Sequence, residues 1–195
     1  SWLAPMSEHY NAIVQKLADR LVAVDLLGRA YNILETQLSA GNLTPNEAGT
    51  VGTRMALINL FNNQPEKAVA ILDKTESDRL TPTIIAHRRI IRAKALSALG
   101  RPQEALDLLK EDYSRNGILV KTEIFWNNRQ WGDAADSIKY LIEKPQKGRP
   151  LTNEQIQLIL EWATALKKAG RETVIVRLRN TFKPYFQNTP YISIF

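Results

Sequence analysis

Histidine and cysteine, the residues most often used in metal sites and nucleophilic catalysis, are scarce in this chain. Its 195 residues include two histidines and no cysteine. His9 and His87 lie far apart, and neither has a carboxylate partner at the spacing of an HExxH zinc motif. Without cysteine, disulfides, zinc–thiolate sites and cysteine nucleophiles are excluded. We therefore expect no metal site and no cofactor, and we interpret His87 as a helix-surface residue.

Carboxylates offer the remaining route to chemistry, because closely spaced acids can act as general acid and base. The candidate pairs are Glu76 with Asp78, Glu111 with Asp112, and Asp133 with Asp136. All of them fall at the ends or on the polar faces of predicted helices, where carboxylates are usually solvated or lie near a helix N-terminus. The nine glycines are scattered and form no phosphate-binding loop. We therefore predict that the protein is not an enzyme.

The chain is basic, with a net charge of +6 and an isoelectric point near 9.6. Such a balance suits an acidic partner, a membrane surface or nucleic acid. One basic stretch runs from Arg88 to Lys94, and a second from Lys167 to Lys183 lies close to Tyr185 and Phe186. The second stretch could hold phosphates and stack bases. The charges are nevertheless dispersed, so nucleic-acid binding is kept as an alternative to a basic, solvated surface.

The elements that must position these residues all have helical patterns. Apolar residues recur at helical spacing along the chain, and no sustained alternation predicts a strand. Thr44-Pro45-Asn46-Glu47 and Thr152-Asn153-Glu154-Gln155 are capping boxes that predict helix starts. No apolar run approaches the roughly 18 residues of a membrane span, and the N-terminus has no signal-peptide pattern. Because the chain opens with Ser1 rather than Met, we expect a fragment, the C-terminal part of a longer protein.

A repeated hairpin pattern organises the chain. Alanines recur in the second-helix segments at separations of 38, 37 and 29 residues (68−30, 105−68, 134−105). They are Ala30, Ala68, Ala105 and Ala134. Twelve residues earlier a small residue recurs in each copy. These are Ala18, Ala56, Ala93 and Thr122, and a fifth copy aligned on Gly170 adds Ala163. Small side chains where two antiparallel helices cross allow their backbones to approach, and a single pair cannot bury its apolar face alone.

The copy with Ala93, Leu96, Gly100 and Ala105 resembles the tetratricopeptide repeat family at its small, bulky, turn and small positions. The family's turn glycine is replaced in three copies by Asp25, Asn63 and Arg129, and the spacing departs from the usual ~34 residues. The resemblance implies an all-α fold, a right-handed superhelical stack of antiparallel helix pairs forming one domain over residues 1–195. The hairpins are expected at about 7–40, 44–77, 81–113, 117–144 and 151–187.

In the resembling family, first helices line a concave groove that binds a protein or peptide. The residues at groove-type positions are Leu57, Leu60, Phe61, Ile90, Lys94, Glu123, Trp126 and Asn127. We predict a non-catalytic interaction scaffold whose groove is anchored by Trp126, although this indole could instead pack in the core. Leu57, Leu60 and Phe61 could likewise pack against a neighbouring helix. One subtype binds a peptide carboxylate through Lys, Arg and Asn. Here Thr53, Leu57, Ile90 and Lys94 stand at those places, so that clamp is not present.

Two alternatives remain open: nucleic-acid binding, and self-association as an oligomerising segment of a larger envelope protein. The chain also looks like the C-terminal repeat region of large bacterial envelope proteins, which favours the periplasm or envelope over the cytoplasm.

The repeat alignment predicts that Ala105→Glu strongly destabilises the protein. A large carboxylate at a helix crossing adds desolvation to overpacking, on the order of several kcal/mol. Thermal unfolding followed by circular dichroism tests this. If the variant melts within a few degrees of the parent, Ala105 faces solvent and the alignment is wrong.

Overall fold

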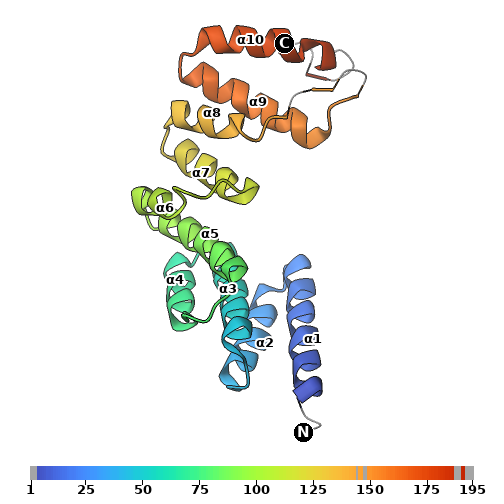
Figure 1. Cartoon of the computed structure of the whole chain (residues 1–195), viewed down its shortest axis with the longest axis vertical. Coiled ribbons are helices and arrows are strands. Elements are labelled where there is room, and N and C mark those ends of the chain that lie inside the picture. The colour runs from blue at the N-terminus through green and yellow to red at the C-terminus, as the bar shows by residue number, and fades with distance from the viewer. Residues whose placement is uncertain (1–3, 144, 147–148, 187–189, 192–195) are drawn as a thin grey trace. The chain divides into compact units, whose positions relative to one another are not determined.

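The computed structural model describes residues 4–143, 145–146, 149–186 and 190–191, and within them it contains ten helices and no strand (Figure 1). The helices are α1 (Ala4–Ala23), α2 (Leu27–Ser39), α3 (Pro45–Phe61), α4 (Pro65–Lys74), α5 (Pro82–Ala98), α6 (Pro102–Leu108), α7 (Arg115–Asn127), α8 (Trp131–Lys139), α9 (Asn153–Lys168) and α10 (Glu172–Phe186). The prediction of an all-α fold is therefore confirmed.

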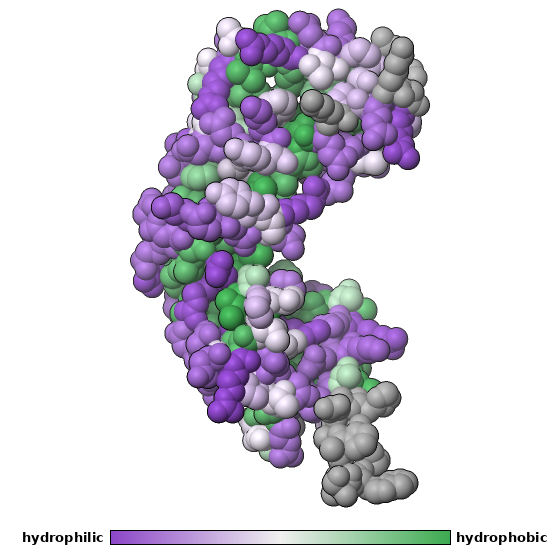
Figure 2. All heavy atoms as spheres, viewed as in Figure 1, coloured by the Kyte–Doolittle hydropathy of each residue, from purple (hydrophilic) through white to green (hydrophobic). Residues whose placement is uncertain are grey.

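Consecutive helices pack as five pairs, α1–α2, α3–α4, α5–α6, α7–α8 and α9–α10. Helices α1 and α7 begin at Ala4 and Arg115, a few residues before the expected hairpin starts at 7 and 117. The chain divides into two compact units, residues 1–109 with α1 to α6 and residues 110–195 with α7 to α10. A single domain over residues 1–195 and a superhelical stack stay predictions. Figure 2 shows apolar side chains reaching the surface between polar ones in both units.

The same turn closes all five hairpins. Its central residue has a left-handed backbone, with φ between 54° and 72°. These residues are Asp25, Asn63, Gly100, Arg129 and Gly170. In each turn the next residue donates its N–H to the carbonyl five positions earlier, at 2.8 to 3.0 Å. This is the Schellman arrangement that ends many helices. The three residues predicted to replace the turn glycine thus occupy its place and adopt its conformation.

The small residues of the repeat lie where the helices cross. They stand seven positions before and five positions after the turn residue. The alanines at these positions in the first four hairpins are at most 1% exposed, and Thr122 is 8% exposed. In the fifth hairpin Ala163 and Ile175 are half-buried. The sequence alignment is therefore confirmed in the first four hairpins, and the burial of Ala105 is what the Ala105→Glu prediction requires.

A buried arginine connects α3, α4 and α5 in the first unit. Arg88 of α5 is 4% exposed, and its guanidinium donates to the carbonyls of Gly49 (3.1 Å) and Leu72 (2.5 Å). It also donates to the Thr75 hydroxyl (3.1 Å) and pairs with the Glu76 carboxylate (3.1 Å). Arg88 was expected on a basic surface, and this part of the prediction is wrong. The carbonyls near the C-terminal end of α4 attract a cation there.

A second polar cluster joins α1, α2 and α3. The Asn11 amide donates to Glu47 (2.9 Å) and accepts from the buried Gln37 amide (3.1 Å). Partial burial opposes ionisation of Glu47. The Thr44 backbone N–H, the Asn11 amide and the Thr44 hydroxyl outweigh that effect and lower the pKa of Glu47 below its ordinary value. The predicted capping box is present, and its carboxylate also ties the start of α3 to α1.

The turn geometry predicts that Arg129→Gly stabilises the protein. A non-glycine residue in the left-handed region costs roughly 1–2 kcal/mol, part of which glycine's greater freedom in the unfolded chain offsets. We expect a gain of about 0.5–1 kcal/mol in the free energy of unfolding, measured by urea denaturation. Gln130→Gly serves as the control. Because Gln130 has φ −82°, glycine relieves no strain there, and this variant should unfold with a lower free energy than the parent. A loss at both positions would contradict the shared turn.

Candidate interaction groove

The structure places the predicted groove residues on both units. In the first unit Leu57, Leu60 and Phe61 lie on α3, and Ile90 and Lys94 lie on α5. Phe61 is 57% exposed, whereas Leu57 is half-buried and Leu60 packs against the core cluster of that unit. Leu60 therefore has the packing role that the sequence left open, and Phe61 is available for contact.

In the second unit Glu123 and Asn127 are exposed on α7, and Trp126 is half-buried beside them. The Trp126 ring meets Trp131 edge to face, with centroids 5.3 Å apart and planes at 87°. Trp126 also packs against the core cluster of this unit, and the Lys168 ammonium of α9 lies 4.5 Å from the Trp131 ring centroid. Trp126 thus packs within its own unit, and its partner contact stays a prediction.

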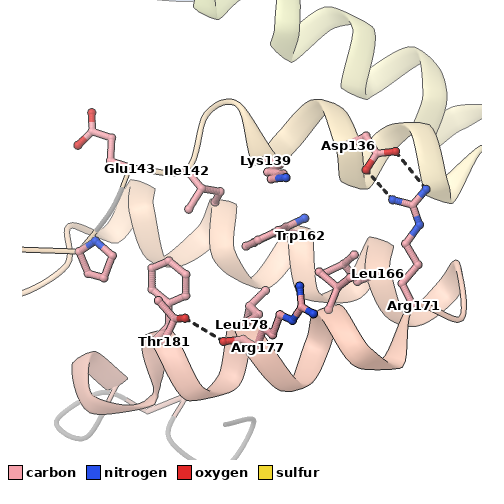
Figure 3. Close-up of a pocket in the computed structure, with 13 residues that line it drawn as sticks. Asp136, Lys139, Ile142, Glu143, Trp162, Leu166, Arg171, Arg177, Leu178 and Thr181 are labelled. Atoms are coloured by element: carbon pink, nitrogen blue, oxygen red, sulfur yellow. Dashed lines mark hydrogen bonds and ion pairs between the residues drawn. The ribbon is translucent and has the colours of Figure 1, made fainter.

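A groove of about 440 Å³ lies within the second unit, over α9 and between α8 and α10. Its apolar lining includes Ile142, Trp162, Leu166, Val174 and Phe182. Figure 3 shows Trp162 of α9 between Lys139 of α8 and Arg177 of α10. The groove is concave and largely apolar with a few polar groups, as ligand-binding surfaces usually are.

The charges around this groove are unevenly paired. Arg171 binds Asp136 through two parallel contacts of 2.5 and 3.1 Å, drawn as dashed lines in Figure 3. The hydrogen bonds to the Asp136 carboxylate raise the pKa of Arg171 above its ordinary value. Glu143 accepts a hydrogen bond from Gln155 at 3.3 Å. Lys139 and Arg177 have no ion pair within the described part of the chain, so cationic groups border an apolar floor.

Three of the six carboxylates considered as catalytic pairs have structural partners. Glu76 pairs with Arg88 and Asp136 with Arg171, and Asp112 accepts from the backbone N–H of Ser114 at 2.9 Å. The described residues include no group of His, Asp or Glu able to hold a metal ion. Among the described helices none has the length and apolar character that crossing a membrane requires.

Some residues of the two basic stretches are buried or ion-paired in the structure, so neither stretch forms a continuous basic surface. Arg88 is buried, and Arg92 pairs with Asp73 at 2.6 Å. Arg177 and Arg179 line different pockets on α10, as their spacing predicts. Phe186, considered as a base-stacking residue, is fully buried and cannot stack on a base. These contacts weaken the structural basis of the nucleic-acid alternative.

None of the residues that line the α8–α10 groove was among those predicted for the partner groove. Asp136 was considered only as a carboxylate pair, and Arg177 only as part of the second basic stretch. Trp162 and Phe182 could have been noticed in the sequence, because they place aromatic rings at the apolar positions of two predicted helices. The sequence did not show that α8 and α10 flank the same face of α9, which is what gathers Lys139, Trp162 and Arg177.

Searches of family models, curated proteins and solved structures found no match to this chain. The geometry of the unit surfaces is therefore the basis for the functional argument.

The contacts of Trp126 predict that Trp126→Ala destabilises the second unit. Truncating a fully buried Trp typically costs about 3–5 kcal/mol, and half-burial should reduce this to about 2 kcal/mol. Chemical denaturation followed by circular dichroism measures the loss. Tyr140→Ala is the control, because Tyr140 is 79% exposed and its truncation should change stability by less than about 0.5 kcal/mol. A Trp126 variant as stable as this control would return Trp126 to the role of exposed anchor.

Proposed function

We propose that this chain is a non-catalytic protein-interaction scaffold of the tetratricopeptide type, and that the α8–α10 groove receives an acidic, amphipathic segment of a protein partner. The five hairpins with a common turn and small crossing residues support the repeat class. The first-helix surface predicted from the sequence, with Phe61 exposed, is kept as a further contact region of the same scaffold.

The combination of an apolar floor with unpaired cations supports this function best. Trp162, which is half-buried, offers aromatic surface to an apolar side chain, and large aromatic contacts contribute much of the affinity at interfaces. Lys139 and Arg177 stand on opposite helices, so a segment lying between α8 and α10 passes both cations. Charge complementarity of this kind selects a partner with carboxylates and speeds its association.

A helix is a suitable form for the bound segment. Two helices with a third as the floor form the kind of hydrophobic groove that accepts an amphipathic helix by its apolar face. Apolar side chains spaced three and four residues apart would contact Trp162, and acidic side chains flanking them would reach Lys139 and Arg177. Arg177 can bind a carboxylate through two parallel hydrogen bonds, whereas Lys139 acts as a point charge.

Photocrosslinking in the native cell tests the proposal. A photoreactive amino acid at Val174, which lines the groove, should join the chain to one protein. The joined peptide should be acidic and amphipathic, as identified by mass spectrometry. The Lys139→Glu/Arg177→Glu variant should lower the yield at least about tenfold, because two attractive contacts become repulsive.

The matched control is Lys110→Glu/Lys183→Glu, which changes the net charge equally at two exposed positions outside the groove. Its crosslinking yield should equal that of the parent. An equal loss in both double variants would reflect net charge alone and contradict a specific groove. Loss of the crosslink after nuclease treatment would instead favour the nucleic-acid alternative.

A further inference from the structure

The first described helix carries an exposed apolar stripe. Tyr10, Ile13 and Leu17 on α1 are 65%, 56% and 45% exposed. Their spacing of three and four residues places them on one face of the helix. Val14 and Ala18 on the other face are buried. Single exposed apolar residues are ordinary in proteins, whereas a row of them on one helix face marks a contact surface.

The common turn shows what this stripe corresponds to in the other hairpins. Ile13 stands twelve positions and Leu17 eight positions before the turn residue Asp25. The equivalent residues of α3, counted from Asn63, are Val51 and Met55, which are 0% and 1% exposed. The residue twelve positions before the turn is also buried in α5 and α9. These residues are Arg88 (4%) and Leu158 (8%).

In each of those hairpins the first helix packs against the second helix of the hairpin before it. The packed pairs are α2 with α3, α4 with α5, and α8 with α9. Helix α1 is the first helix of the described chain, so its stripe has no such cover within it. The stripe therefore has the position and apolar character of a surface that is covered in the hairpins that follow.

Helix α10, the last helix of the second unit, lacks a buried apolar residue that the other second helices share. Nine positions after the turn residue, the second helices of the first four hairpins carry a buried apolar residue. These are Leu34, Leu72, Leu109 and Ile138, each at most 1% exposed. In α10 this position is Arg179, which is exposed. A polar outer face is typical of the terminal repeat of an array. A second copy that used its α10 to cover α1 would therefore bring an arginine where a leucine is needed.

We propose that the α1 face formed by Tyr10, Ile13 and Leu17 is a docking surface for the second helix of another hairpin of this repeat type. The docking helix would carry an apolar residue nine positions after its turn residue. Leu34 has this place in α2, which packs against α3. The surface belongs to the first unit, so the inference does not depend on the groove of the second.

A graft onto the full chain supplies such a hairpin in register. Residues 7–43 replace residues 1–5 directly before residue 6, because residues 44 and 6 both precede their turn residue by nineteen positions (63−44, 25−6). Helix α2 of the graft should then cover α1 of the original chain as it covers α3, where Val51 and Met55 stand at the positions of Ile13 and Leu17. We expect the melting temperature to rise by about 5 °C or more and amide hydrogen exchange in α1 to slow at least about tenfold.

Two controls make this test specific. Ile13→Glu/Leu17→Glu in the original α1 should leave the ungrafted chain within a few degrees of the parent, since both side chains are exposed, and should abolish the gain in the grafted chain. A graft of residues 7–40, three residues shorter, breaks the register and should give no gain. Equal stabilisation by both grafts, or by neither, would overturn the proposal.

The oligomeric state shows whether a second copy of this chain covers the stripe instead of a repeat hairpin. If light scattering finds the ungrafted chain as a dimer that Leu17→Glu dissociates, and the register-matched graft gives no gain, the stripe pairs with a second copy and the proposal is wrong. A monomeric ungrafted chain that the matched graft stabilises supports it.

Discussion

The left-handed turn is the constraint on which every hairpin depends. Its backbone conformation and the hydrogen bond across it fix where the second helix starts relative to the end of the first. Two crossing positions follow from that geometry, seven residues before and five after the turn, and alanine fills nearly all of them. Because the turn is shared, hairpins with little sequence in common keep one register, and Asp25, Asn63 and Arg129 accept a strained backbone to maintain it.

At some positions where the other hairpins bury an apolar residue, a buried polar residue makes the contact instead. Arg88 stands at the position that Val51 occupies in α3, and no aliphatic side chain could satisfy the carbonyls that it binds. Hydrogen bonds to a charged group contribute about 1.5–3 kcal/mol each, and truncating the arginine would leave those carbonyls and Thr75 without this partner. Gly52 allows the same close approach, since a Cβ there would clash with Thr75. The α3–α4–α5 contact thus uses charge and small size in place of apolar volume.

The proposed function depends on side chains that remain unpaired after folding. Several charged residues that were considered for catalysis or nucleic-acid binding instead form ion pairs within the fold. They are Arg88, Arg171, Glu76 and Asp136. Lys139 and Arg177 around Trp162, and the exposed stripe on α1, have no comparable partners in the described part of the chain. These two surfaces differ in chemistry, one being cationic with an apolar floor and the other purely apolar. The proposed partners differ accordingly, an acidic segment for the first and a repeat hairpin for the second.

The sequence by itself determined the helical class, the five hairpins, the turn residues and the small crossing positions. All of these follow from interactions within about forty residues, where periodicity, capping and turn chemistry act. Tertiary structure decided which side chains stay available. Arg88 and Arg92 look alike in sequence, yet Arg88 is buried because α5 lies across the end of α4, and Trp162 meets Lys139 and Arg177 because two helices flank the third. Burial and ion pairing depend on neighbours brought together from distant positions, and no local pattern encodes them.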